Sequence, residues 1–187
     1  MKYKLLLLAM CAVSFAFGQT NYRISNYSLA VKGSSNLHDW TSNAKEVRAN
    51  GSFTFVAGAL KSVDALYVEI PVKSIKSEKG SIMDNKTYDA LKADRFGNIT
   101  YKLGKITSLT KKGDGYDINA TGSLSIAGVT NNIDMYVKAK VGADGSITFS
   151  GSKKIKMTEY QIKPPTALLG TLTTGDDVEI VFQVTLK

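Results

Sequence analysis

The sequence predicts an all-β fold in which eight antiparallel strands close into a barrel, with one short helix inserted between strands. Three observations predict this fold. Apolar and polar residues alternate with a period of two in eight segments. Turn signals such as Asp114-Gly115 separate neighbouring segments by only a few residues, as in hairpins. Most segments have no helical pattern between them, which excludes the crossover helices of a parallel sheet.

The chain begins with a segment typical of an export signal. Lys2 and Lys4 precede an almost unbroken apolar run, and the small residues Ala16 and Gly18 close it. The run is about 13 residues long, short of the roughly 20 needed to cross a bilayer. We therefore expect residues 1–18 to be a signal peptide that is removed. Residues 19–187 would form a single exported, periplasmic domain.

Residues 8–11 superficially resemble the box that precedes a lipidated cysteine. Met10 is the wrong size for its place in such a box, and apolar sequence continues past Cys11. We expect no lipoprotein anchor. Signal cleavage would leave a domain without cysteine, so its stability would depend on its core alone.

Composition excludes several kinds of chemistry. The chain has one histidine and one cysteine, His38 and Cys11, so three or four His or Cys ligands for a metal ion cannot be assembled. Lys and Arg outnumber Asp and Glu by 24 to 16. Most of these cations are lysines scattered along the chain, whereas nucleic-acid binding favours clustered arginine. We expect no metal, no catalytic residues and no nucleic-acid partner.

The eight predicted strands follow one another through the mature chain. They cover residues 29–37, 47–55, 66–72, 99–103, 116–126, 133–141, 147–157 and 178–186. Residues 81–94 instead show helical spacing, which predicts a short helix with Asp84 as its cap. Pro164-Pro165 lacks ladder donors, so residues 163–170 are expected to form a loop near the rim.

The polar residues of these strands indicate which face of the barrel is apolar. In a membrane barrel they would face lipid, at a cost of roughly 2 to 4 kcal/mol per lysine near the midplane. The apolar stripe is therefore predicted to face inward. The polar residues concerned are Glu69, Asp134, Lys138, Lys140, Glu179 and Gln183.

Small residues share the inward register with large ones, and this pattern has two interpretations. Gly33, Ala49, Gly51, Gly122 and Gly151 could leave an apolar space for a hydrocarbon chain. They could instead mark sharp bends whose space is filled by large neighbours. We take the hollow barrel as the hypothesis. Its predicted lining is Leu29, Val31, Phe53, Phe55, Leu66, Val68, Ile70, Ile99, Tyr101, Leu103, Ile118, Leu124, Ile126, Met135, Val137, Phe149, Ile155 and Phe182.

Several motifs in this order resemble the YceI-like domain family, from about Tyr22 to the C-terminus. They are residues 33–40 (GSSNLHDW), 51–53 (GSF), 70–75 (IPVKSI), 83–84 (MD), 122–130 (GSLSIAGVT), 156–160 (KMTEY) and the last strand. The resemblance implies an extended lipocalin-like barrel, exported to the periplasm, that encloses a polyprenyl lipid or the tail of an isoprenoid quinone. Two departures concern the head-group preference: Ala127 replaces a frequent His, and residues 96–99 lack the usual Pro.

We therefore expect non-enzymatic binding, transport or storage of a long isoprenoid lipid, with no cofactor besides that ligand. The alternative is a filled barrel that acts through its surface as a stress-related or interaction module. Transient membrane contact and pairing of two copies as a homodimer are left open.

Six residues are candidates for the barrel mouth. His38 would either bond a ligand oxygen or fix its turn through Asp39, and the second role is favoured. The helical residues would either plug the barrel end or form a lid over it. Lys153, on the inward register, would either face a head group or mark a strand end. The candidates are His38, Trp40, Met83, Tyr88, Leu91 and Lys153.

Overall fold

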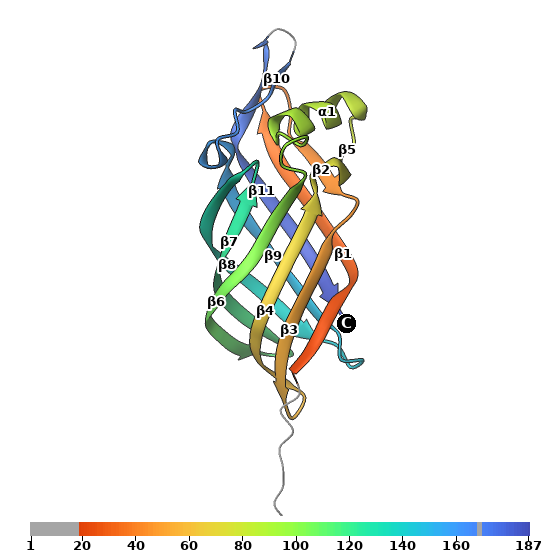
Figure 1. Cartoon of the computed structure of the whole chain (residues 1–187), viewed down its shortest axis with the longest axis vertical. Coiled ribbons are helices and arrows are strands. Elements are labelled where there is room, and N and C mark those ends of the chain that lie inside the picture. The colour runs from red at the N-terminus through yellow and green to blue at the C-terminus, as the bar shows by residue number, and fades with distance from the viewer. Residues whose placement is uncertain (1–18, 168–169) are drawn as a thin grey trace, which may run out of the picture.

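The computed structural model is a closed barrel of eight antiparallel strands, as predicted (Figure 1). It describes residues 19–167 and 170–187. The expected signal peptide, residues 1–18, lies outside the described residues. The first strand is described from Gln19, the first described residue.

The barrel strands are joined mainly by hairpins, and the last strand pairs with the first to close the wall. Most of them are longer than the sequence pattern predicted. In order around the barrel they are β1 (Gln19–Ser35), β3 (Arg48–Val56), β4 (Ala59–Pro71), β6 (Asn98–Lys112), β7 (Gly115–Ile126), β8 (Val129–Val141), β9 (Ile147–Lys156) and β11 (Leu172–Leu186).

The turn between β7 and β8 illustrates how a few neighbouring residues determine a hairpin. Between β7 and β8, Ala127 and Gly128 have φ values of 50° and 85°, the conformation of a primed two-residue turn that suits the twist of the strands. A side chain at Gly128 would collide with the ring of Phe96. Glycine is therefore required there both by the backbone and by packing.

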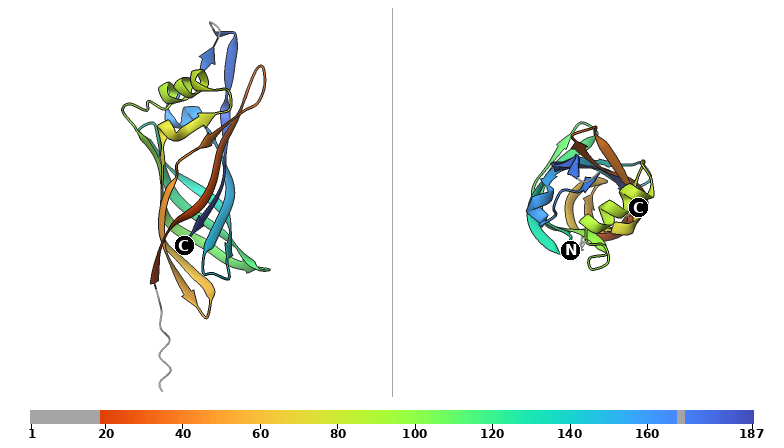
Figure 2. Two further views of the ribbon diagram at one scale, coloured as in Figure 1. Left: turned by 90° about the vertical axis from the view of Figure 1, so that its right-hand side faces the viewer. Right: turned by 90° about the horizontal axis from the view of Figure 1, so that it is seen from above.

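Short elements cover the end of the barrel that we call the upper end (Figures 1 and 2). There β2 (Trp40–Ala44) pairs with β1 and with β5 (Ile75–Ser77), and α1 (Ser81–Ala90) follows β5. The 3-10 helices are η1 (Val72–Ser74) and η2 (Met157–Tyr160). The expected loop at 163–170 contains β10 (Thr166–Ala167), which pairs with β11. In the described part, no helix is long and apolar enough to cross a membrane.

The cap predicted for the helix is wrong. Gly80 occupies the N-cap position, and Asp84 lies inside the first turn, where it is buried. Its carboxylate accepts a 2.7 Å hydrogen bond from the backbone N–H of Ser77 and lies 3.4 Å from the ammonium of Lys76. Asp84 therefore attaches α1 to β5.

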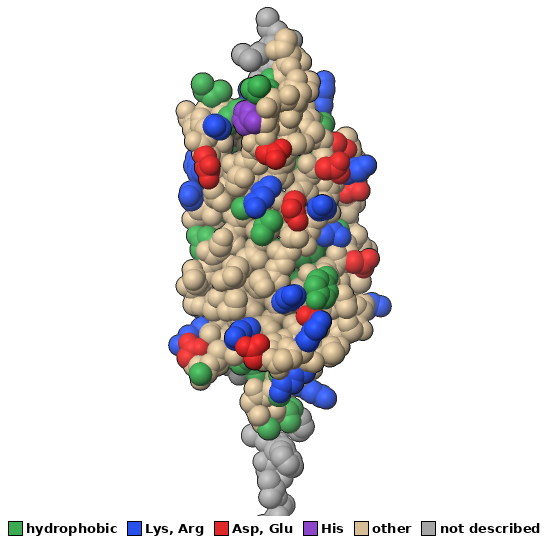
Figure 3. Space-filling model, turned by 180° about the vertical axis from the view of Figure 1, so that it is seen from behind, with side chains coloured by type: hydrophobic (Ala, Val, Ile, Leu, Met, Phe, Trp, Pro, Cys, Tyr) green, Lys and Arg blue, Asp and Glu red, His purple; other side chains and the backbone are tan. Residues whose placement is uncertain are grey.

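The two faces of the wall have the predicted polarity. Asp134, Lys138, Lys140 and Gln183 are exposed on the outer face. Figure 3 shows acidic and basic side chains dispersed over one side of the molecule, without a patch of one sign. Exposed ion pairs contribute only about 0–1 kcal/mol each, so the barrel is held chiefly by its interior.

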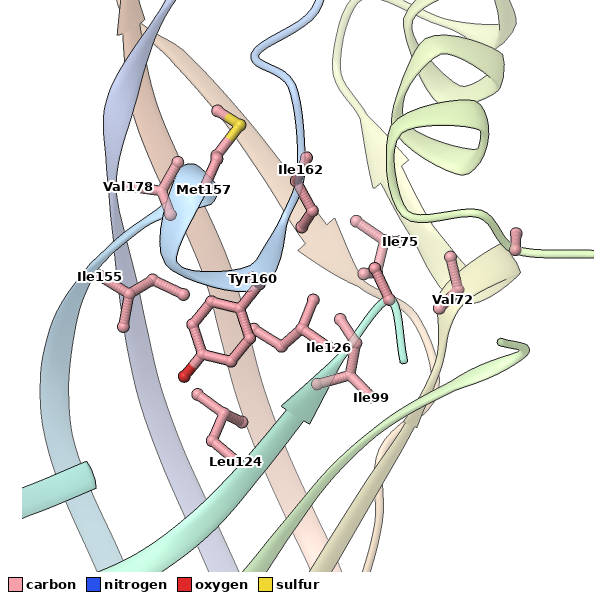
Figure 4. Packing of buried hydrophobic residues seen from close by; sticks show 12 residues of the cluster. Val72, Ile75, Ile99, Leu124, Ile126, Ile155, Met157, Tyr160, Ile162 and Val178 are labelled. Carbon is pink, nitrogen blue, oxygen red and sulfur yellow. The ribbon is translucent and has the colours of Figure 1, made fainter. Parts of the chain in front are cut away.

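The interior is packed differently at its two ends. At the end opposite α1, which we call the lower end, Phe53, Ile147 and Leu186 are 0% exposed. The rings of Tyr22 and Phe53 pack edge to face there, with centroids 5.0 Å apart. At the upper end a second cluster surrounds the fully buried Tyr160 (Figure 4). The lower end is thus closed by side chains, and any hollow must lie above it.

Candidate functional site

Two cavities lie one above the other inside the barrel. The lower one has a volume of about 140 Å³, and the upper one, of about 390 Å³, lies beneath α1. Ile99 and Ile180 line both cavities, so the two adjoin. The upper volume alone falls within the roughly 300–1,000 Å³ typical of ligand pockets. The hollow interior that the sequence favoured is therefore present.

The lower cavity is almost wholly aliphatic and aromatic. Of the described residues that line it, Lys153 alone is charged. Burial raises the pKa of the Tyr101 hydroxyl, which also lines this cavity. Such a lining offers a ligand few hydrogen-bond partners. The free energy of binding would therefore come mainly from removing hydrocarbon from water.

The upper cavity is apolar below and polar at its rim. Ile126, Ile155 and Met157 belong to its apolar wall. His38, Lys79, Lys86, Ser77 and other polar residues form the rim. A molecule with a long apolar chain and one polar end matches this gradient, because the chain can lie in the barrel while the polar end stays hydrated.

Most residues predicted to line the interior do so. The lower cavity is lined by Leu29, Leu66, Val68, Ile70, Ile99, Tyr101, Leu103, Ile118, Leu124, Met135, Val137, Phe149 and Phe182. The upper cavity is lined by Val31, Ile99, Ile126 and Ile155. Phe53 and Phe55 line neither cavity, which corrects the prediction for these two: they belong to the packed lower end, where Phe53 is fully buried.

The inward glycines do not create the hollow. A Cβ atom added to Gly33 would collide with the indole of Trp40, and one added to Gly122 would lie 2.5 Å from the Tyr101 hydroxyl oxygen. At Gly151 a Cβ atom would lie 3.0 Å from the ring of Phe182. Large neighbours therefore fill the space that these glycines leave, as the alternative interpretation held. The hollow exists where aliphatic side chains from opposite walls do not meet.

His38 lies at the mouth but does not fix its turn through Asp39. Among the described residues, no hydrogen bond joins their side chains. Ser35 holds the turn instead, because its hydroxyl donates a 2.7 Å hydrogen bond to the His38 carbonyl and accepts one from the His38 N–H. Trp40 is fixed by its indole N–H, which donates to the Ser34 carbonyl at 3.1 Å. The His38 side chain is exposed and lines the upper cavity.

Helix α1 is anchored on one side and lightly held on the other. The Tyr88 hydroxyl donates to the Lys73 carbonyl of η1 at 2.9 Å, lies 3.2 Å from the Ile75 carbonyl of β5, and accepts from the Lys76 ammonium at 2.6 Å. Tyr88 is therefore a structural anchor that packs against the cluster at the upper end, in keeping with a plug at the barrel end, and it does not line the cavity. Across the mouth, the Lys86 ammonium donates to the Thr166 carbonyl at 3.0 Å. Met83 and Leu91 line the upper cavity.

Tyr160 carries a buried hydroxyl without a hydrogen-bond partner in the described part of the chain. Its ring lies among Leu124, Ile126 and Ile155, with the hydroxyl directed into this apolar group (Figure 4). Burial raises the pKa of the Tyr160 hydroxyl, and the nearby Asn131 amide acts in the opposite direction. The Asn131 amide itself donates a 2.9 Å hydrogen bond to the Glu159 carbonyl. Among the described residues, the hydroxyl is therefore an unsatisfied buried polar group.

Some lining residues were missed by sequence reasoning. Ile180, Val184 and Leu186 share the inward register with Phe182, so the alternation of the last strand could have identified them. Tyr160 and Lys86 gave no such signal, since each reaches the cavity from a short helix that covers the barrel end. Lys153 is also placed differently from the prediction, because it lines the lower cavity within the wall.

The apolar lining of both cavities suits binding through burial of hydrocarbon. In the part of the chain that the structure describes, no group of three or more His, Cys, Asp or Glu could hold a metal ion.

The sequence matches the family model of the YceI-like domain over residues 25–186. Among curated proteins, no sequence matches the chain.

Three solved structures have a similar fold. BcnA from Burkholderia cenocepacia has a TM-score of 0.64 and 20% identity, covering 85% of this chain and 95% of that chain. A polyisoprenoid binding domain from Saccharophagus degradans, implicated in plant cell wall breakdown, has a TM-score of 0.68 and 13% identity, covering 91% and 99%. The YceI protein of Campylobacter jejuni has a TM-score of 0.58 and 25% identity, covering 99% and 97%.

Proposed function

The chain belongs to the YceI-like domain family, and from that premise we propose that it is a non-enzymatic protein that binds and carries or stores a long isoprenoid lipid. The observation that carries the proposal is the pair of adjoining apolar cavities inside the barrel. A family and fold that include a polyisoprenoid binding domain support a binding protein rather than an enzyme.

The dimensions and chemistry of the hollow favour a chain over a compact ligand. The two cavities lie in succession and meet at Ile99 and Ile180, so an occupant that fills both must be elongated. Each methylene buried there would contribute roughly 0.8 kcal/mol, less the cost of immobilising the chain. A polyprenyl lipid or the tail of an isoprenoid quinone meets this requirement, and the Saccharophagus degradans domain supports testing isoprenoids first.

Export to the periplasm is part of the proposal and rests on the signal-like residues 1–18. A carrier there would have to exchange its lipid with a membrane. Leu37 and Ile82, at 71% and 73% exposed, are large apolar side chains near the upper end, where the wider cavity lies. They would suit a transient contact of that end with a bilayer surface.

The test is to identify what the exported protein carries. Protein purified without detergent would be weighed by native mass spectrometry and then extracted with organic solvent, and the extract would be analysed by mass spectrometry. We expect about one isoprenoid lipid per barrel and a mature chain that starts at Gln19. A protein that is empty, and that stays empty after incubation with polyprenyl lipids and quinones, would refute the proposal and favour a surface interaction module.

A further inference from the structure

The ladder between β8 and β9 is incomplete. Paired residues run from Val141–Ile147 to Val137–Gly151 and stop there. Beyond this point β8 continues to pair with β7, and β9 continues to pair with β11. Residues 129–136 and 152–156 therefore present facing strand edges without ladder pairs, and we call this part of the wall the β8–β9 seam.

Side chains bridge the seam in place of backbone hydrogen bonds. The Lys153 ammonium on β9 donates a 2.8 Å hydrogen bond to the Asp134 carbonyl on β8. At the upper end of the seam, the Asn131 amide of β8 donates at 2.9 Å to the Glu159 carbonyl of η2, which follows β9. Side-chain bridges of this kind can be released one at a time, whereas a ladder resists opening along its whole length.

The seam lies between the lower cavity and a hollow on the outer surface. This outer hollow has a volume of about 550 Å³ and includes Tyr136, which is 48% exposed. Ala120, Met135 and Lys153 line both the outer hollow and the lower cavity. The wall is therefore only one layer of side chains thick there, and Lys153 is part of that layer.

Lys153 is placed to bind an anion. It shares the inward register with Phe149 and Ile155 and is the charged residue of an otherwise uncharged cavity lining. Among the ion pairs of the described residues, none involves Lys153, and its one hydrogen-bond partner is a neutral carbonyl. An ammonium has three donors. A charge beside apolar surface is better stabilised by an anionic oxygen than by a carbonyl.

We propose that the β8–β9 seam is a side opening of the lipid cavity, where Lys153 binds an anionic oxygen of the ligand head group, either carboxylate or phosphate. The inference rests on the proposed function, since it needs a chain in the barrel. Asp134 and Glu179 also line the outer hollow and repel an anion, whereas Lys154 attracts one. The head group is therefore held on the inner side of the seam, by Lys153.

The test compares three probes that share one chain: geranylgeraniol, geranylgeranoic acid and geranylgeranyl phosphate. Binding to the delipidated full-length mature protein would be measured by displacement of a fluorescent fatty acid. We expect the acid, the phosphate or both to bind wild type more tightly than the alcohol, and the stronger of the two identifies the head group. Lys153→Met should weaken the anionic probes about 10- to 100-fold, as for loss of a hydrogen bond to a charged group, and leave the alcohol unchanged.

Two further variants separate charge from structure. Lys153→Gln keeps a donor for the Asp134 carbonyl but lacks the charge, so it should show the same selective loss even if Lys153→Met folds poorly. Lys138→Met removes an exposed lysine on β8 that lines none of the three cavities described above, and should change nothing.

The outcomes distinguish the inference from the function on which it rests. Equal binding of all three probes by wild type, or an equal loss for all three in Lys153→Gln, overturns the side opening while leaving the lipid cavity in place. Failure of wild type to bind any of the probes overturns the proposed function together with this inference.

Discussion

Enlarging one residue that faces the lower cavity should stabilise the protein without lipid while weakening its hold on lipid. Ala120 on β7 is 6% exposed, lines the lower cavity and lies between Ile106 and Met135 of the neighbouring strands. Ala120→Leu adds three carbon atoms, which at roughly 0.8 kcal/mol each would contribute about 2.4 kcal/mol if they fill empty space. Ordering the leucine side chain costs about 0.5–1 kcal/mol of this.

The expected gain is therefore about 1.5 kcal/mol, or about 3–6 °C in melting temperature for a domain of this size. It would be measured by urea and thermal unfolding of delipidated protein, because a bound ligand stabilises the folded state and would mask the change. The same leucine occupies space that the lipid chain needs, so lipid affinity should fall.

Ala139→Leu is the matched control. Ala139 is a buried alanine on the adjacent strand β8, but it lies in the packed lower end against Tyr116 and Phe149 and lines neither interior cavity. Overpacking there should cost about 1–3 kcal/mol. If Ala120→Leu destabilises the delipidated protein as much as Ala139→Leu does, the lower cavity is not empty space and the reasoning fails.

Three other perturbations follow from particular contacts. Tyr160→Phe removes a buried hydroxyl without a partner in the described part, so the delipidated protein should gain about 1 kcal/mol in urea unfolding; a loss would reveal a bond that the hydroxyl makes. The pKa of Asp176 is lowered because Thr158 donates to its carboxylate through its hydroxyl and its backbone N–H. This contribution to stability is present above the unfolded pKa of about 3.9 and is lost as the pH falls through the lower folded value. Asp176→Asn should therefore be less stable near neutral pH and show a smaller loss of stability between about pH 5 and 2 in acid titrations; an unchanged acid profile would contradict it. Lys86→Met removes the hydrogen bond from α1 to Thr166, so amide exchange in α1 should speed up and lipid should dissociate faster; unchanged exchange would show that the β5 contacts alone hold the helix.

The alternation of residue types was enough to predict the barrel and its polarity. On β9, Phe149 and Ile155 alternate with Ser152 and Lys154, and the structure places the first two inside and the last two outside. A period of two decides the face of a strand because successive side chains point to opposite sides of the sheet. The order of hairpins then leaves few topologies, and pairing of the last strand with the first closes the barrel.

Alternation does not give the height of a residue along the barrel axis. Phe53 and Phe149 are both inward and aromatic, yet Phe53 fills the closed lower end and Phe149 also borders a cavity. Height depends on the stagger between neighbouring strands, which is set by strand tilt and by irregularities such as the register shifts between β3 and β4. The prediction for Phe53 failed for this reason.

The sequence by itself determined the presence of the eight barrel strands, the helix and the apolar interior, because each depends on residues near one another in the chain. Only the tertiary structure decided that Trp40 fills the space beside Gly33, that Tyr160 reaches the upper cavity, and that Lys153 lies in the β8–β9 seam. Each of these depends on which side chains face one another across strands, and so on a register that emerges only when the barrel closes.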